Sequence, residues 1–283
     1  MLGANLDYFI LRSLAHSRNR ATEEHLDASY RCDAVASSAA AVLKLRKLVD
    51  RFEGHFPIDP GLSYLDMGCG SGELTMAIAR LGARRITGVD YLPRNIQRAT
   101  AHARQSGMAR DVQFVCRDLH AWVPDRKYDV LLSIDAFEHI EDPLALLRGM
   151  AGLIAPGGIA VLAFGPLFHS PFGDHMWDFF RLQVPWRGVL FSEQAVLRVR
   201  RECFRPTDPA SAYPQVAGGL NLMRYSDFLE YVRHSGWVFD FLAVNTFLKK
   251  PGALREISDF LTGIALVRDY FVHNVYAVLR RAG

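Results

Sequence analysis

The sequence predicts an α/β fold in which helices cover both faces of a doubly wound parallel sheet. Between residues 62 and 164, short apolar runs alternate with helical patterns, as is typical of parallel strands joined by helices. A Gly-rich turn joins the first apolar run to the first helical pattern. The expected strands are Leu62–Met67, Arg85–Asp90, Val112–Cys116, Tyr128–Ile134 and Ile159–Phe164. The expected helices are Glu73–Leu81, Pro93–Ser106 and Pro143–Ile154.

The chain divides into four expected segments. Residues 1–60 are expected to form an N-terminal helical cap, because Leu43, Leu45 and Leu48 recur among basic residues as an amphipathic stripe. Residues 61–165 form the core, residues 166–224 an insertion, and residues 225–283 complete the core. The completing elements are expected at Tyr225–Ser235, Trp237–Thr246 and Tyr270–Leu279.

The insertion is expected to form a lid over the substrate. It is rich in proline and shows no regular period, and long irregular connections in compact domains are usually functional. The aromatic residues between positions 164 and 191 favour a lid over the alternative, a packed subdomain that touches no ligand. These aromatics are Phe164, Phe168, Phe172, Trp177, Phe179, Phe180, Trp186 and Phe191. A solvated helix face, or alternatively a grip on a phosphate or carboxylate, is expected of Arg198, Arg200, Arg201 and Arg205.

Composition and charge disfavour several other classes of protein. The 283 residues include 33 basic and 30 acidic side chains, and the net charge of +3 is too small to indicate nucleic-acid binding. The four cysteines are far apart, so neither a disulfide framework nor a structural zinc site is expected. No apolar run approaches the ~20 residues of a membrane span, and the N-terminus lacks a signal-peptide pattern. We therefore expect a cytoplasmic protein, whose oligomeric state stays open.

The Gly-rich turn carries the strongest functional signal. Gly68, Gly70 and Gly72 follow a buried strand and precede a helix, where glycines allow a tight turn and close approach to a ligand. Asp90 ends the second strand, where a carboxylate can accept hydrogen bonds from a ribose diol. Asp118 follows the third strand, where an acceptor can meet an adenine amine. All these residues lie at the strand ends where open α/β sheets bind ligands.

These motifs resemble those of class I S-adenosylmethionine (SAM)-dependent methyltransferases. Leu65–Gly72 is similar to the family's first motif, and Gly88–Asp90 to its acidic second-strand motif. Tyr128–His139 is similar to its fourth-strand motif, and Leu153–Gly158 to its Leu-x-x-Pro-Gly-Gly turn. The resemblance implies a seven-stranded Rossmann-like sheet with an antiparallel last strand, and SAM as the cofactor.

The resemblance also implies which residues hold SAM. The glycine turn faces the amino-acid end, the end of the second strand holds the ribose, and the loop after the fourth strand passes near the methyl group. The implied set is Asp66, Gly68, Cys69, Gly70, Gly72, Asp90, Tyr91, Asp118, Leu119 and Asp135. A dehydrogenase is disfavoured because Glu73 replaces its third glycine and Asp66 would repel a pyrophosphate.

Three histidines are candidates to remove a proton from the acceptor. His139 lies in the loop after the fourth strand, and His169 and His175 follow the fifth strand. Imidazole has a suitable pKa for this task, and Asp174 could orient one of the rings. For each histidine a purely structural role is the alternative.

A divalent metal is a further alternative, although no metal ligand is assigned. Asp135-x-x-Glu138-His139 resembles the Glu-x-x-Glu-His pattern of ubiquinone-type O-methyltransferases, with Asp in place of the first Glu. With a further histidine, such a set of nitrogen and oxygen donors would suit Mg²⁺, Mn²⁺ or Fe²⁺.

The expected function is SAM-dependent methyl transfer to a small or lipid-like acceptor with an apolar or aromatic body. Oxygen is the favoured acceptor atom, because the histidines would serve to deprotonate a hydroxyl. An RNA or protein methyltransferase is the first alternative. A second is a SAM-binding fold that acts as a pericyclase, scaffold or sensor, because a fold does not settle a function.

Overall fold

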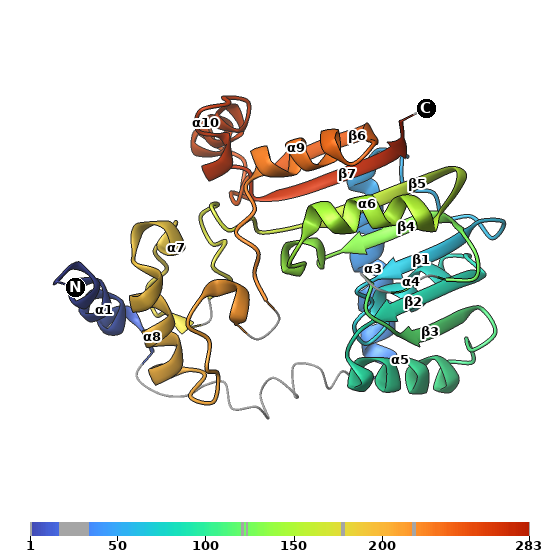
Figure 1. The fold of residues 1–283 in the computed structure, drawn as a ribbon, viewed down its shortest axis with the longest axis horizontal. Coiled ribbons are helices and arrows are strands. Elements are labelled where there is room, and N and C mark those ends of the chain that lie inside the picture. The colour runs from blue at the N-terminus through green and yellow to red at the C-terminus, as the bar shows by residue number, and fades with distance from the viewer. Residues whose placement is uncertain are drawn as a thin grey trace.

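One seven-stranded mixed sheet organises the molecule (Figure 1). The computed structural model describes residues 2–16, 34–119, 122, 124–176, 179–216 and 219–282. Its strands follow the order β3 (Val112–Cys116), β2 (Arg85–Asp90), β1 (Ser63–Met67), β4 (Tyr128–Ile134), β5 (Ile154–Phe164), β7 (Asn274–Arg281) and β6 (Trp237–Asn245). Only the pairs made by β7 are antiparallel. The expected doubly wound fold with an antiparallel last strand is confirmed.

Helices cover both faces of the sheet because its central strands are apolar on both sides. All five residues of β1 are buried, as expected for a parallel strand with helices on either face. On one face lie α3 (Ala34–Val49), α4 (Glu73–Arg80) and α5 (Pro93–Gln105). On the other lie α6 (Pro143–Leu153) and α9 (Tyr225–His234). No helix in the described ranges has both the length and the apolar character needed to cross a membrane.

The last part of the chain departs from the expected elements at three points. β5 begins at Ile154 rather than Ile159, with a register shift opposite Tyr128 and Val130, so the Pro-Gly-Gly segment lies within the strand. β7 begins at Asn274 rather than Tyr270, because a 3₁₀ turn, η5 (Arg268–Tyr270), precedes it. An unexpected helix, α10 (Ala253–Thr262), joins β6 to this turn.

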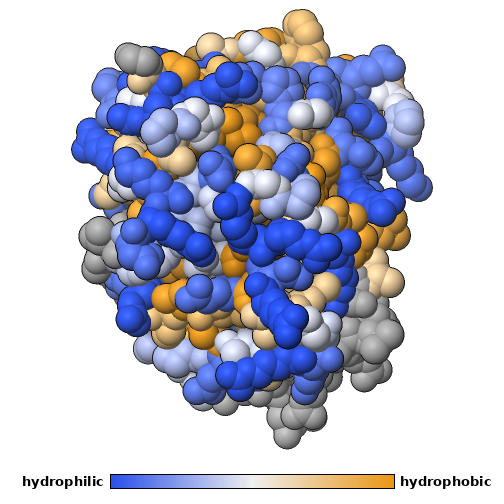
Figure 2. All heavy atoms as spheres, turned by 90° about the vertical axis from the view of Figure 1, so that its right-hand side faces the viewer, coloured by the Kyte–Doolittle hydropathy of each residue, from blue (hydrophilic) through white to orange (hydrophobic). Residues whose placement is uncertain are grey.

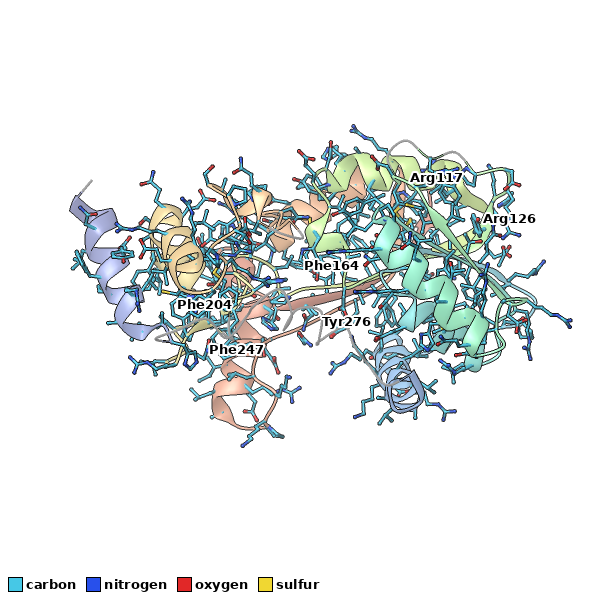
Figure 3. All side chains as sticks on the ribbon, turned by 90° about the horizontal axis from the view of Figure 1, so that it is seen from below. Arg117, Arg126, Phe164, Phe204, Phe247 and Tyr276 are labelled. Carbon is cyan, nitrogen blue, oxygen red and sulfur yellow. The ribbon has the colours of Figure 1, made fainter. Side chains whose placement is uncertain are left out.

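The insertion builds a separate core with the N-terminal helix. It contains α7 (Arg187–Leu190), α8 (Glu193–Cys203) and η4 (Tyr213–Gln215), and α1 (Leu2–Leu14) packs along α8 (Figure 1). Phe180 and Phe204 are buried in this core. Figure 3 shows that Phe204 lies away from Phe164 at the end of β5. Several insertion aromatics therefore stabilise the insertion itself. Residues 17–33 of the expected cap and Trp177 lie outside the described residues.

Two expectations for charged residues of the insertion are wrong. Asp174 does not orient a histidine ring, because both of its oxygens accept hydrogen bonds from Arg187, at 2.6 and 2.9 Å. Arg200 is not on a solvated face, because it is 7% exposed and forms an ion pair with Asp208. By contrast, Arg198 is an exposed partner of Glu202.

The Asp174–Arg187 pair is the most deeply buried ion pair described, with both side chains 1% exposed. The guanidinium also lies 3.9 Å from the centre of the Phe180 ring. Desolvated charges of this kind tolerate the loss of a partner poorly, because the remaining charge has no compensation.

We predict that Asp174→Asn lowers the free energy of unfolding by about 3–5 kcal/mol, because it leaves the Arg187 charge buried and uncompensated. Urea denaturation of the full chain measures this loss. The matched control is Glu230→Gln, which breaks the exposed Glu230–Arg233 pair and should cost at most about 1 kcal/mol. Equal effects of the two substitutions would contradict the prediction.

Candidate active site

The candidate site lies along the edge of the sheet where the parallel strands end. β1 ends at Met67, β2 at Asp90, β4 at Ile134 and β5 at Phe164. Open α/β sheets bind ligands outside this edge, where the direction of chain crossover changes. Here that change falls between β1 and β4, and we call the edge the rim.

The glycine turn between β1 and α4 leaves room for a ligand at the rim. Gly68, Gly70 and Gly72 all have positive φ, of 80°, 53° and 80°, which only glycine adopts without strain. A Cβ on Gly70 would have no atom within 4 Å, so open space lies beside the backbone there. A Cβ on Gly68 would lie 2.9 Å from the Cβ of Ala136, so the turn touches the loop after β4.

Asp90 fixes this turn from the end of β2. One carboxylate oxygen accepts hydrogen bonds from the backbone amide of Gly70 at 3.0 Å and from the side-chain amide of Asn95 at 3.2 Å. The other accepts from the Leu92 amide at 2.8 Å. A carboxylate offers about four acceptor directions, so capacity is left for a ribose hydroxyl. The open space at Gly70 and this acceptor fit the ribose and amino-acid portion of SAM.

Asp66 and Cys69 are buried beneath the turn. Asp66 is 2% exposed and accepts a 2.6 Å hydrogen bond from the Thr75 hydroxyl. Burial raises the pKa of Asp66 to about 6, against the opposing effect of that hydrogen bond, and Asp90 adds to the rise. Burial likewise raises the pKa of Cys69, which therefore stays a neutral thiol.

The residues expected near the adenine lie beyond β2 and β3. Tyr91 is 66% exposed, and its carbonyl accepts a hydrogen bond from Cys116 at the end of β3. Asp118 is exposed, whereas Leu119 is half-buried and packs against the core. These positions suit a shallow adenine pocket, and their role in binding stays a prediction.

Asp135 is held at the rim by its backbone. Its φ is 52°, and its amide donates to the Ala163 carbonyl at 2.8 Å. Its exposed carboxylate forms a 3.1 Å ion pair with Lys44 of α3. The sequence analysis did not single out Lys44, because the partners are 91 residues apart and no local pattern connects them.

Glu138 is a buried carboxyl group in the same loop. It is 3% exposed, and one oxygen accepts from the Gly165 amide at 3.2 Å, while the other has no hydrogen-bond partner among the residues that the structure describes. Burial raises the pKa of Glu138 from about 4.5 to about 7, with a smaller contribution from Asp135. No local pattern signals this burial, because the adjacent His139 is exposed, and in the sequence Glu138 stands out only as a possible metal ligand.

His139 and His175 meet at the rim. Their ring centres lie 5.4 Å apart in an edge-to-face arrangement. Nδ1 of His139 lies 2.8 Å from the Gly219 carbonyl, and a carbonyl can only accept, so Nδ1 carries the proton. In neutral His139, Nε2 is therefore the basic atom. Burial lowers the pKa of His175, whose Nε2 lies 3.0 Å from the Pro166 carbonyl.

His169 is placed differently from this pair. Its ring packs edge to face against Phe168 and Tyr270, and burial lowers its pKa. Its Nδ1 is buried without a hydrogen-bond partner. The contacts of His169 are those of a packing residue, whereas His139 and His175 share one cluster.

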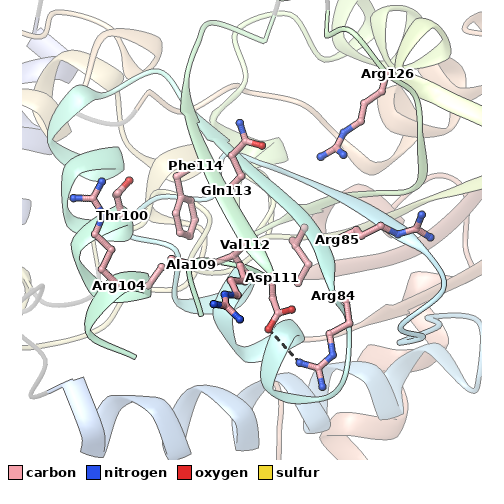
Figure 4. A pocket seen from close by; sticks show the side chains of 13 residues that line it. Arg84, Arg85, Thr100, Arg104, Ala109, Asp111, Val112, Gln113, Phe114 and Arg126 are labelled. Atoms are coloured by element: carbon pink, nitrogen blue, oxygen red, sulfur yellow. Dashed lines mark hydrogen bonds and ion pairs between the residues drawn. The ribbon is translucent and has the colours of Figure 1, made fainter. Parts of the chain in front are cut away.

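A hollow of about 470 Å³ lies at the opposite end of the sheet (Figure 4). It is lined by Arg84 and Arg104 around the apolar side chains of Val112 and Phe114, and Arg84 pairs with Asp111. These residues stand at the beginnings of β2 and β3, so the hollow is separate from the rim.

No group of three or more His, Cys, Asp or Glu side chains in the described ranges is placed to hold a metal ion. Asp135 faces Lys44, while Glu138 faces the Gly165 amide. The Asp135, Glu138 and His139 set considered in the sequence is therefore not gathered around one point in this structure.

Comparisons with known proteins agree with this geometry. Residues 40–164 match the family described as "Methyltransferase domain". A ubiquinone biosynthesis O-methyltransferase of Cereibacter sphaeroides is 44% identical over 101 residues, which cover 36% of this chain and 40% of the relative. Residues 40–164 form a class I SAM-dependent methyltransferase domain. The chain spans about 40% of the length of that relative.

Solved structures resemble the methyltransferase domain and the parts around it. An S-adenosylmethionine-dependent methyltransferase from Mesorhizobium loti aligns with a TM-score of 0.53 at 17% identity, covering 82% of this chain and 96% of that one. The cyclase SpnF aligns with the same TM-score and identity, covering 99% and 95%. At such identity the likeness shows the fold alone.

We predict that Asp90→Ala weakens SAM binding by ~10-fold or more, because a charge-assisted hydrogen bond to the ribose is lost. Titration calorimetry with SAM and with its demethylated product measures the change. Asp111→Ala, at the opposite end of the sheet, is the matched control and should leave the affinity unchanged. Tighter binding of NAD than of SAM to the wild type would contradict the assignment.

We also predict a pH dependence of stability that comes from Glu138. Because its pKa is raised, the folded state holds the Glu138 proton more tightly than the unfolded state does. The contribution of Glu138 to the free energy of unfolding therefore falls as the pH rises from about 4.5 to about 7, and it is constant above pH 7. Relative to Glu138→Gln, the wild type should lose roughly 3 kcal/mol between pH 4 and pH 8. Urea denaturation of both proteins at each pH isolates this difference, and parallel curves would contradict it.

Proposed function

We propose that this protein transfers a methyl group from SAM to a hydroxyl of a small, lipid-like acceptor with an apolar or aromatic body. The observation that carries the proposal is the continuity of the rim. Gly68 of the cofactor turn touches Ala136, two residues before Glu138, and the adjacent His139 contacts His175 of the insertion. A site for the cofactor and a basic group for the acceptor are thus parts of one surface.

SAM supplies an already reactive methyl group, so the protein must chiefly hold and orient the two reactants. The glycine turn and Asp90 would hold the cofactor. His139 would take the hydroxyl proton, because its Nδ1 donates to the Gly219 carbonyl and its basic Nε2 belongs to an exposed side chain. Glu138, next to it and buried, would position this loop through the Gly165 amide.

The acceptor class is supported by the relatives and by the aromatic residues at the rim. The Cereibacter sphaeroides relative is a ubiquinone biosynthesis O-methyltransferase. Phe172 and Trp186 of the insertion contact Phe247, which follows β6, with ring centres 5.7 and 6.4 Å apart. This aromatic cluster suits an acceptor with an apolar body. The lid role of the insertion stays part of the proposal.

Turnover of a short-chain polyprenyl catechol with labelled SAM tests the proposal. The expected result is a labelled methyl ether and release of demethylated SAM. SAM binding without methyl transfer to any such catechol would overturn the proposal. It would leave the two alternatives, methyl transfer to RNA or protein and a role that does not transfer methyl groups.

We predict that His139→Ala lowers kcat by about 100-fold while SAM affinity stays within a few-fold, because a general base typically contributes roughly 10²–10⁴-fold. His169→Ala is the matched control and should stay within a few-fold of wild type. Steady-state kinetics measure both variants, alongside calorimetry with SAM. If His139→Ala were as active as wild type, the acceptor would ionise without this base.

A further inference from the structure

One side of α10 is apolar and faces solvent. At 3.6 residues per turn, Leu254, Ile257, Phe260 and Leu261 share an arc of about 120°. The first three are 75%, 56% and 70% exposed. Ser258, outside this arc, is the buried residue of the helix.

The helix is attached to the protein by its polar edge. Asp259 accepts a 3.0 Å hydrogen bond from the hydroxyl of Thr246, which follows β6. The apolar surface also continues past the helix, where Ile264 is 37% and Leu266 is 88% exposed. An amphipathic helix usually turns its apolar side to the core, so this orientation calls for a partner.

Most of the exposed large apolar side chains belong to segments in one half of the molecule. In that half, at the left of Figure 1, Phe9 on α1 and Leu190 on α7 are exposed as well as α10. The opposite end, where the strands begin, is largely covered by hydrophilic side chains (Figure 2). The molecule therefore has an apolar side, and α10 projects from it.

The chain leading back from α10 reaches the candidate site. Between η5 and β7, the carbonyl of His273 would lie 2.5 Å from a Cβ on Gly165, and the Gly165 amide donates to Glu138. Trp186 of the insertion donates a 2.8 Å hydrogen bond to the Tyr270 carbonyl. A surface that binds α10 would thus lie beside the rim.

Basic residues accompany the apolar surface. Lys249 and Lys250 are exposed and directly precede α10. Arg255 lies in its first turn, where it donates to the Lys249 carbonyl and pairs with Asp259. On α10 itself Arg255 is offset by Glu256 and Asp259, so the net positive charge comes from Lys249 and Lys250. Exposed Leu, Ile and Phe next to two exposed lysines match a segment that lies in the interface of a bilayer with anionic headgroups.

We propose that α10 with Ile264 and Leu266 is a membrane-docking surface that places the rim against an anionic lipid bilayer, from which the acceptor is taken. The idea that the acceptor comes from the bilayer rests on the proposed function. The docking itself does not, because it needs neither cofactor nor acceptor.

Flotation of the full chain with vesicles, without SAM or acceptor, tests the docking. We expect binding to vesicles of phosphatidylcholine mixed with phosphatidylglycerol. Replacing Leu254, Ile257 and Phe260 together by Ser should weaken it by ~10-fold or more. Lys249→Ala with Lys250→Ala should weaken binding to these mixed vesicles by about 10-fold and should leave binding to vesicles of phosphatidylcholine alone unchanged. Leu43→Ser, at an exposed leucine of α3, is the control and should bind as wild type does.

Three results would overturn the docking proposal. The first is that the wild type does not bind the mixed vesicles, and the second is that the triple variant binds them as well as the wild type does. The third is that the wild type is a dimer that binds no vesicle and that the triple substitution converts to a monomer. The last would make this surface an interface between two copies of the chain. Vesicle binding that persists while no catechol is methylated would overturn the proposed function alone.

Discussion

The close approach of Gly68 to Ala136 is the constraint on which the site depends. The turn after β1 and the loop after β4 come together only because both residues in contact are small. Gly68 has no side chain, and the side chain of Ala136 ends at Cβ. A larger side chain at either position would push the loop that carries Glu138 and His139 away from the cofactor turn. The cofactor half and the acceptor half of the site are joined at this contact.

The sheet could be predicted from the sequence because its signals are local. β2, β3 and β4 have the expected bounds, since apolar runs bounded by glycine, proline and charged residues define buried strands. α10 was missed although Leu254, Ile257 and Phe260 recur with a helical period, and the sequence could not reveal that this apolar side faces solvent. For α8 only a helix face carrying the arginines was expected, and its bounds could not be predicted because the prolines around it obscured its period.

The features of the site that could not be predicted from the sequence are contacts between residues that are far apart in it. Motif position placed Asp90 and His139 at the rim, and the structure shows them there. The Arg187 partner of Asp174, the Lys44 partner of Asp135 and the contact between His139 and His175 all depend on tertiary packing. The raised pKa of Glu138 also arises from burial, which a single carboxylate in a sequence does not disclose.

The antiparallel direction of β7 has a consequence for how such a protein can diversify. β6 runs parallel to β5, so the connection from β6 back to β7 emerges at the rim, as the insertion after β5 does. Two long segments of independent sequence thus border the side proposed for the acceptor, whereas the glycine turn follows β1. Changes in either segment can alter which molecule is admitted while the machinery that holds SAM stays intact.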